Sequence, residues 1–185
     1  MAKTASNMLP LGIVAPDFNL LNPRNLKRQS LQELASKKAT VVMFICNHCP
    51  YVKHILPELI LQARELQAKG VSYIAINSND VLNYPDDSPA EMAKLAENLD
   101  FPFAYLFDDT QEIAKAYNAA CTPDFFAFDD QLQLIYRGRF DDATPGNLVP
   151  VTGEDLKHAM NLWLESQLLV KEQYPSVGCN IKWNK

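Results

Sequence analysis

The sequence lacks the features that would place it on a nucleic acid, in a membrane or in a disulfide-stapled scaffold. Its 185 residues carry a formal net charge of -5. No cluster of lysine or arginine supplies the concentrated positive charge that phosphate contacts need. No segment approaches the roughly 20 consecutive apolar residues of a membrane span. Four cysteines are too few to hold a chain of this length together by disulfides. We therefore expect neither a nucleic-acid partner nor a membrane association.

Length and composition predict one globular domain. Hydrophobic residues make up 48% of the chain, enough for a sizeable core, and neither internal repeats nor low-complexity tracts occur. We expect residues 1–170 to form this domain and residues 171–185 to form a C-terminal tail, which carries Cys179. The apolar stretch near the N-terminus is interrupted by Pro10 and Gly12 and is too short for the core of a signal peptide. We therefore expect a cytoplasmic protein.

A pair of cysteines follows the apolar run 41–45 directly. The segment Cys46-Asn47-His48-Cys49-Pro50 reads as a dithiol placed where a buried strand turns into a helix. The free N–H groups and the positive dipole of a helix start stabilise a thiolate and lower the cysteine pKa. Cys46 is therefore the candidate nucleophile. Cys49, one helical turn later on the same face, is the candidate resolving thiol, which attacks a mixed disulfide formed at Cys46.

Strands and helices alternate from about residue 40, which predicts an α/β protein with parallel strands. The predicted strands are 41–45, 71–76 and 103–107, followed by an antiparallel hairpin of 125–128 and 132–136. A first helix carries an apolar stripe over 52–66, which Pro57 should kink or interrupt. The next helix is expected to begin with a capping box at Ser88 and Glu91. A third helix, capped by Asp109 and Glu112, is expected to bury Ile113, Ala116 and Tyr117. The last helix is expected to begin at Thr152 and Asp155.

This order resembles the thioredoxin fold over nearly the whole chain. The motif around Ala15–Phe18 is similar to the N-terminal β-hairpin extension of peroxiredoxins, and the segment between Asn77 and Phe101 is similar to their inserted helix. The run from Phe44 to Val52, Thr122-Pro123, "GRFDD" at 138–142 and "GCNIKW" at 178–183 resemble the peroxiredoxin-like branch of the alkyl hydroperoxide reductase and thiol-specific antioxidant (AhpC/TSA) family. The resemblance implies a central mixed sheet flanked by helices.

The same resemblance implies a role for the proline loop. Thr122-Pro123 is expected to be a cis peptide that lies against the dithiol and offers backbone groups to an extended substrate segment. His48 acts independently of the resemblance, because an imidazole beside Cys46 stabilises its thiolate and makes the pair more oxidising. A histidine at this place resembles disulfide isomerases and bacterial disulfide oxidases, with potentials of roughly -180 and -120 mV against about -270 mV for thioredoxin.

The favoured function is that of a thiol-disulfide oxidoreductase. A reducing cytosol keeps the dithiol reduced, so the expected partners are a disulfide-containing protein or a small-molecule oxidant, with an unidentified thiol reductant restoring the pair. No cofactor is expected. An antioxidant thiol peroxidase is the alternative, in which Cys46 becomes a sulfenic acid that condenses with Cys49 or Cys179. Peroxiredoxins carry Pro-x-x-x-Thr-x-x-Cys, and this chain lacks that motif before either cysteine.

A redox-inert binding or metal module is the third reading. Two cysteines could form half of a zinc site, but the sequence has no second pair, so we expect no metal. Cys121 is expected in the core, although it precedes the Thr-Pro loop. Cys179 lies among residues that look exposed. Two alternatives stay open for it, a resolving or regulatory thiol and a cysteine packed within the tail. Two further expectations are that Arg137 and Arg139 face solvent and that Asp86 and Asp87 form a solvated loop.

Overall fold

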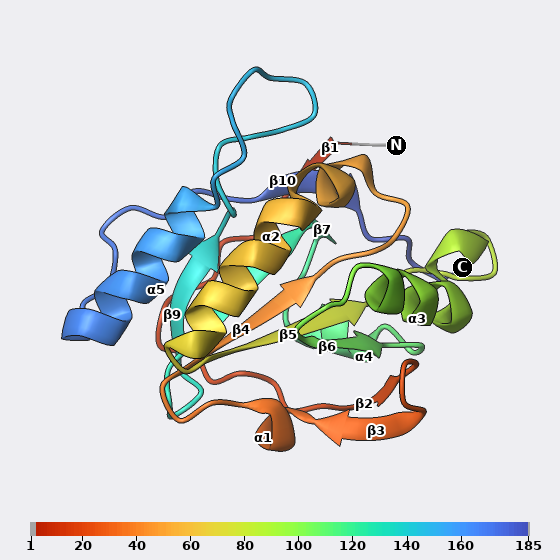
Figure 1. Cartoon of the computed structure of the whole chain (residues 1–185), viewed down its shortest axis with the longest axis horizontal. Helices are drawn as coiled ribbons and strands as arrows, with labels where there is room; N and C mark the ends of the chain where they lie inside the picture. Colours follow the sequence, from red (N-terminus) through yellow and green to blue (C-terminus); the bar gives the residue numbers. More distant parts are fainter. Residues whose placement is uncertain (1–2, 185) are drawn as a thin grey trace.

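The structure, a computed structural model, describes residues 3–184 and arranges them around a mixed β-sheet (Figure 1). Within these residues, seven strands pair in the order β3-β2-β6-β5-β4-β8-β9. β4, β5 and β6 are parallel, β8 and β9 form the predicted antiparallel hairpin, and β2 and β3 form the predicted N-terminal hairpin. The strands are β2 (Asn19–Asn22), β3 (Lys27–Ser30), β4 (Ala39–Phe44), β5 (Val71–Asn77), β6 (Ala104–Phe107), β8 (Asp124–Phe128) and β9 (Leu134–Gly138).

Helices cover both faces of this sheet. They are α1 (Leu31–Leu34), α2 (Pro50–Ala68), α3 (Pro89–Asn98), α4 (Glu112–Ala116) and α5 (Glu154–Ser166), with a short 3-10 helix, η1 (Pro85–Asp87), before α3. Every residue of β4 is buried, and its side chains alternate between the faces. Val41 and Met43 pack in one core with α2, α3 and α5, whereas Val42 and Phe44 pack in a second core with α1 and α4. The predicted α/β architecture with its flanking helices and inserted helix is confirmed.

A second, smaller sheet joins distant parts of the chain. Its strands are β1 (Lys3–Ala5), β10 (Val177–Asn180) and β7 (Cys121–Thr122), paired in the order β1-β10-β7. Both pairings are antiparallel, and they hold the C-terminal segment beside the start of α2 (Figure 1). The segment that follows residue 170 therefore contributes a strand to the structure.

The helix α2 continues through Pro57, so of the predicted kink or interruption the interruption does not occur. A proline inside a helix costs about 3 kcal/mol because it removes one hydrogen bond and crowds the preceding turn. The buried stripe of Ile55, Leu56 and Leu59 around it outweighs this cost. None of the helices in the described part of the chain is both long and apolar enough to cross a membrane.

Two predicted helix starts differ in detail. Ser88 is the N-cap of α3, but its side chain makes no capping hydrogen bond, and Glu91 instead accepts a hydrogen bond from Lys94 at 2.6 Å. The N-cap of α4 is Gln111 in a left-handed conformation, so the predicted caps at Asp109 and Glu112 were wrong. This start turns Ala114 into the core and leaves Ala116 exposed.

The prediction that Arg137 faces solvent was wrong. Its side chain is 0% exposed and makes a two-pronged ion pair with Asp124, whose side chain is also fully buried. Residues outside the hairpin of β8 and β9 cover this edge of the sheet. The guanidinium of Arg137 donates to the backbone carbonyl of Asn7, and the backbone N–H of Arg137 donates to the side-chain oxygen of Gln173. Arg139 is only partly exposed and pairs with Asp155.

Candidate active site

The two cysteines of the predicted dithiol lie at the carboxyl end of β4. Cys46 follows that strand after Ile45, and Cys49 is the N-cap of α2. The helix therefore begins at Pro50, and Cys49 rather than Cys46 lies next to the free backbone N–H groups of its first turn. Cys46 is 1% exposed and Cys49 is 0% exposed, so the structure brings the pair together but buries it.

The two cysteines lose one proton readily and share the other. A hydrogen bond from the Cys46 thiol, opposed by burial and helped by the Val52 amide, lowers the pKa of Cys49 to about 5. The same hydrogen bond, together with burial and the nearby charge of Asp87, raises the pKa of Cys46 well above its ordinary value. The hydrogen bond from Cys46, with a smaller contribution from the Val52 amide at the helix start, thus stabilises a thiolate at Cys49, where the sequence had suggested Cys46.

The contacts of Thr122 favour a second state, in which the shared proton is on Cys49. The Cys49 thiol donates to the backbone carbonyl of Thr122 at 3.1 Å, which requires the proton to be on Cys49. In that state the charge falls on Cys46, whose Sγ lies 3.4 Å from the Thr122 hydroxyl. A hydroxyl donor there stabilises the thiolate. The pair titrates as one unit, and Thr122 supports the state in which Cys46 carries the negative charge.

The predicted Thr122-Pro123 loop is at the dithiol. The peptide bond between the two residues is cis, as expected from the resemblance. Thr122 ends β7, and Pro123 leads into β8, which pairs with β4 immediately before Cys46. This pairing explains why a loop 76 residues away in sequence meets the cysteines. A pocket lined by Tyr51, Pro123 and Val177, among others, lies beside it.

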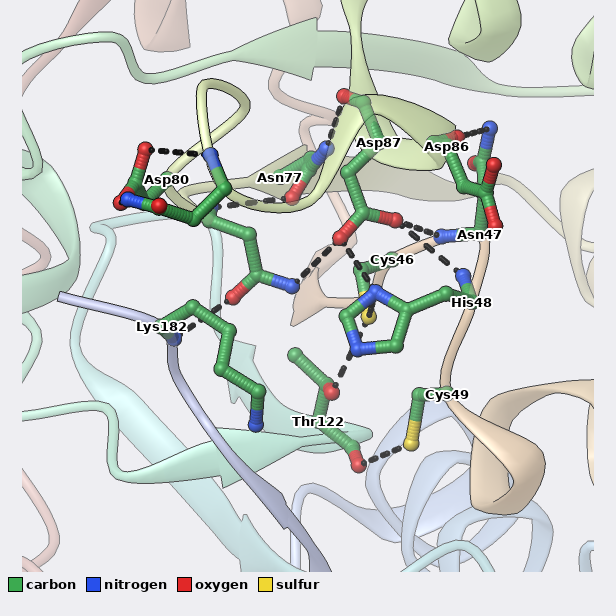
Figure 2. Close-up of polar contacts among 12 residues, drawn as sticks. Cys46, Asn47, His48, Cys49, Asn77, Asp80, Asp86, Asp87, Thr122 and Lys182 are labelled. Carbon is green, nitrogen blue, oxygen red and sulfur yellow. Dashed lines mark hydrogen bonds and ion pairs between the residues drawn. The ribbon is translucent and has the colours of Figure 1, made fainter. Parts of the chain in front are cut away.

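His48 is held by a carboxylate that the sequence analysis had assigned to solvent. Asp87 is 0% exposed, and its carboxylate lies 2.5 Å from Nδ1 of His48 (Figure 2). The same carboxylate accepts the backbone N–H groups of Asn47 at 2.8 Å and His48 at 3.1 Å. Burial alone would raise the pKa of Asp87, but hydrogen bonds from His48 and Asn79 outweigh it and lower that pKa. Asp87 therefore fixes both the loop and the imidazole.

The imidazole lies between this carboxylate and the dithiol. Nδ1 of His48 is 4.0 Å from Sγ of Cys46, and the ring stacks on Tyr84 with 5.1 Å between centroids. Asn77 and Asn79 at the end of β5 bind the backbone carbonyl and the carboxylate of Asp87, each at 2.8 to 2.9 Å. The inserted segment between β5 and α3 thus supplies the carboxylate to the dithiol.

The remaining cysteines, Cys121 and Cys179, are both buried. Cys121 is 0% exposed, and its thiol points to the carbonyl of Pro123 at 3.5 Å. Cys179 is 3% exposed and lies in β10, where its thiol hydrogen-bonds the sulfur of Cys49. The tail is therefore packed on the dithiol.

Three donor groups of the site could meet one metal ion. Atoms of Cys46, His48 and Asp87 lie within 4.8 Å of one another. A thiolate, an imidazole and a carboxylate suit zinc, and Cys49 would be a fourth donor nearby. However, Nδ1 of His48, the ring nitrogen that faces both partners, is already hydrogen-bonded to Asp87. As placed here, the imidazole serves that carboxylate rather than an ion.

Comparison with known proteins gives a family and a fold. The model of the AhpC/TSA family matches residues 11–137. An uncharacterized conserved protein from Geobacillus kaustophilus is 52% identical with a TM-score of 0.97, covering 100% of this chain and 97% of its own. A hypothetical protein from Sinorhizobium meliloti 1021 is 41% identical with a TM-score of 0.95, covering 98% of both chains. No protein of curated function matches the sequence.

A more distant structure identifies the fold. The thioredoxin domain of a thiol-disulfide oxidoreductase from Bacteroides vulgatus is 16% identical, with a TM-score of 0.66, and the match covers 85% of this chain and 100% of that domain. At this identity the likeness is one of fold. The fold is thioredoxin-like, as the order of strands and the position of the dithiol had indicated.

Proposed function

The chain belongs to the AhpC/TSA family, and from this we propose that it is a thiol-disulfide oxidoreductase whose redox centre is the dithiol of Cys46 and Cys49. The observation that carries the proposal is the shared proton of the two sulfur atoms, which lowers the pKa of Cys49 to about 5. A pair with this pKa holds a thiolate at neutral pH, and the thiolate is the form that attacks disulfides.

In the proposed reaction Cys46 attacks first. With the proton on Cys49 and directed at the Thr122 carbonyl, the Cys46 thiolate attacks one sulfur of a substrate disulfide. A Cys46–substrate disulfide forms, the substrate S–S bond breaks, and the other substrate sulfur leaves and takes a proton. Cys49 then attacks Cys46, the bond between Cys46 and the substrate breaks, and the proton of Cys49 passes to the substrate sulfur that leaves. The substrate gains two electrons and two protons, and the pair becomes a disulfide.

Two neighbours assist this sequence. The Thr122 hydroxyl, 3.4 Å from Sγ of Cys46, stabilises negative charge on that sulfur before attack and after departure. His48 is itself partly exposed, lies beside Cys46 and is oriented by Asp87. An incoming disulfide would approach from this side, since Cys49 is enclosed by Thr122, by the start of α2 and by β10.

The partners follow from the direction of electron flow. We place the reaction in the cytoplasm, where a reducing environment favours the dithiol, so the substrate would be a disulfide-containing protein or a small oxidant. A thiol reductant would return the pair to the dithiol by the same two exchange steps in reverse. Because β10 already pairs with the backbone edge at Thr122, the pocket beside Pro123 is the place where a segment of a protein substrate would bind.

A redox titration in glutathione buffers, read by alkylation and mass, tests the proposal. We expect one two-electron midpoint and a Cys46–Cys49 disulfide in the oxidised protein. Cys46→Ser should abolish the reduction of a protein disulfide, and Cys49→Ser should accumulate a mixed disulfide at Cys46. Cys121→Ser is the matched control and should keep the wild-type midpoint. If no disulfide forms at any buffer ratio, the proposal fails; trapping of the protein substrate by Cys46→Ser and not by Cys49→Ser would exchange the two roles.

One observation favours a peroxidase as the second candidate. A threonine hydroxyl beside a reactive cysteine can position a peroxide, and Thr122 supplies such a hydroxyl at Cys46, although from a different place in the sequence than in peroxiredoxins. The rate of the reduced protein with hydrogen peroxide separates the two functions. A rate no faster than that of a free thiol leaves disulfide exchange as the function, whereas rapid formation of a sulfenic acid at Cys46 would favour the peroxidase.

A further inference from the structure

The edge of the dithiol site is already occupied by a strand of the chain itself. β10 pairs antiparallel with β7, and Cys179 stands opposite Thr122 in that register. Thr122 is the residue whose hydroxyl and carbonyl contact Cys46 and Cys49. β10 therefore lies along the backbone edge that an extended substrate segment would use.

The contact between the two strands is close. A Cβ added at Gly178 would lie 2.0 Å from the carbonyl oxygen of Thr122, so only glycine permits this approach. On the C-terminal side, the N–H of Ile181 donates to the carbonyl of Ala120 at 3.2 Å. The N–H of Lys182 donates to the side chain of Asn79 at 2.8 Å, the asparagine that also binds Asp87. The position of Cys179 is therefore fixed from both sides.

Three sulfur atoms meet at this point. The Cys49 sulfur is hydrogen-bonded to both Cys46 and Cys179. Burial and the neighbouring Cys49 charge raise the pKa of Cys179 to about 12, while Lys182 acts in the opposite direction. Once Cys46 and Cys49 form a disulfide, the charge on Cys49 is gone and this repulsion disappears. Cys179 then faces the sulfur of a disulfide bond instead of a thiolate.

We propose that Cys179 is a third thiol of the exchange reaction and attacks Cys49 in the Cys46–Cys49 disulfide. A Cys49–Cys179 bond forms, the Cys46–Cys49 bond breaks, and Cys46 leaves as a thiolate that receives the proton given up by Cys179. One disulfide is consumed and one is formed, so no further oxidant or reductant is needed. This inference rests on the proposed function of the dithiol.

Two consequences follow from such a transfer. Cys46 is released as a thiol and can attack again while the disulfide is stored between α2 and β10. The bridge also ties β10 to the active site, so the same strand that covers the edge becomes covalently locked over it. Cys121 takes no part, since its thiol is directed at the carbonyl of Pro123.

The test uses the full-length Cys46→Ser variant with oxidised glutathione as the probe. An excess of glutathione disulfide forces one glutathione onto Cys49 and releases the other, and this loading step does not report which cysteine attacks a protein substrate first. We expect Cys179 to displace that second glutathione, so that peptide mass mapping finds a Cys49–Cys179 bridge. In Cys46→Ser/Cys179→Ser the adduct at Cys49 has no such exit and should accumulate at least tenfold more. The matched control, Cys46→Ser/Cys121→Ser, should form the bridge as the single variant does.

Other outcomes separate the inference from the proposed function. An equal and lasting glutathione adduct in the variants with and without Cys179 would overturn the third-thiol role while leaving Cys46–Cys49 exchange intact. The wild-type protein, mapped over a series of glutathione ratios, gives a second reading in case the serine variant folds poorly. There we expect both bridges, with the Cys49–Cys179 bridge absent from Cys179→Ala. A wild-type protein that forms neither bridge would refute both ideas, and one that forms only Cys46–Cys49 would refute the inference.

Discussion

Asp87 organises the active-site loop through four contacts made by one buried carboxylate. It binds the imidazole of His48, the backbone N–H groups of Asn47 and His48, and the side chain of Asn79. A buried charge is tolerated when it is paired and fully hydrogen-bonded, and these contacts meet that condition. The loop between the two cysteines therefore takes its conformation from a residue about 40 positions away in the sequence.

Asp87→Asn should destabilise the protein and loosen this loop. The amide keeps the shape of the side chain but loses the charge. Its NH2 group replaces an oxygen that accepts hydrogen bonds, and therefore faces other N–H donors. We expect a loss of about 1.5–3 kcal/mol in the free energy of unfolding. Because the folded-state pKa of Asp87 is lowered, its contribution is present above the unfolded-state pKa and is lost as the pH falls below about 4. Urea unfolding of both proteins at neutral and acid pH measures this.

The neighbouring carboxylate supplies the control for that measurement. Asp86 is exposed, and only its backbone carbonyl contacts Asn47, so Asp86→Asn should leave the free energy of unfolding within about 0.5 kcal/mol of the wild type. A stability difference between wild type and Asp87→Asn that does not shrink at acid pH would show that the charge of Asp87 is not the stabilising feature.

The shared proton of the dithiol predicts two separate titration steps. In the reduced wild-type protein we expect the first thiolate to form with an apparent pKa of about 5. The second thiolate should form with an apparent pKa well above 9.0. Cys46→Ser removes the hydrogen bond that contributes most to the low pKa of Cys49, so this first step should move upward in pH. Ultraviolet absorbance of the thiolate, recorded against pH, follows both steps. An unchanged midpoint in Cys46→Ser would mean that the helix start alone sets the pKa.

Sequence patterns singled out the candidate site residues that lie close together in the chain, and the family resemblance added Thr122-Pro123, but both missed the buried contacts of Asp87 and Arg137 with distant residues. Cys46, His48 and Cys49 stand within four positions and follow an apolar run, which indicated both the chemistry and its place. Asp87 and Arg137 were both assigned to solvent, and the structure buries both. Their burial depends on the inserted segment and on the N-terminal residues folding over them, and nothing in the spacing of single charged residues records such long-range contacts.

Among the elements, the strands β4, β5, β6, β8 and β9 and the long helices were predictable from their apolar pattern, and the hairpin of β2 and β3 from the family resemblance, whereas β10 was not predicted. Its four residues, Val177–Asn180, have no alternating apolar pattern, and the surrounding polar residues suggested an exposed tail. The strand exists because β7 and β1 offer backbone partners on its two sides. A strand this short is specified by its neighbours and by the glycine that allows close approach.

Gly178→Ala should displace β10 and uncover the dithiol. The added methyl group would overlap the carbonyl of Thr122, so the strand must shift and its backbone hydrogen bonds must weaken. We expect the alkylation rate of Cys46 and Cys49 under native conditions to rise about tenfold, which corresponds to roughly 1.4 kcal/mol in the free energy of local opening. Rates are measured by quenched alkylation and mass. Gly146→Ala, where an added Cβ meets nothing within 4 Å, is the matched control and should react as the wild type does.

At the scale of the whole molecule, the buried pair of Asp124 and Arg137 joins parts of the chain that carry the site. Asp124 begins β8, immediately after Pro123, and Arg137 lies on β9 and reaches the carbonyl of Asn7. The guanidinium also stacks on Phe126 at 3.9 Å. Burial raises the pKa of Asp124, and the attraction of Arg137 offsets this only in part. The pair therefore fixes the proline loop to the far edge of the sheet at a cost in desolvation.

Asp124→Asn should consequently destabilise the whole protein, because it leaves the Arg137 charge buried without a counter-ion. Breaking a buried ion pair from one side costs about 3–5 kcal/mol in the free energy of unfolding, whereas loss of an exposed pair costs about 0–1 kcal/mol. Arg64→Ala, which removes the exposed pair with Asp100, is the comparison variant. Urea unfolding should show a large shift for the first and almost none for the second. Equal shifts would mean that the buried pair contributes no more than a surface contact, and the proline loop would then have to be held by the sheet alone.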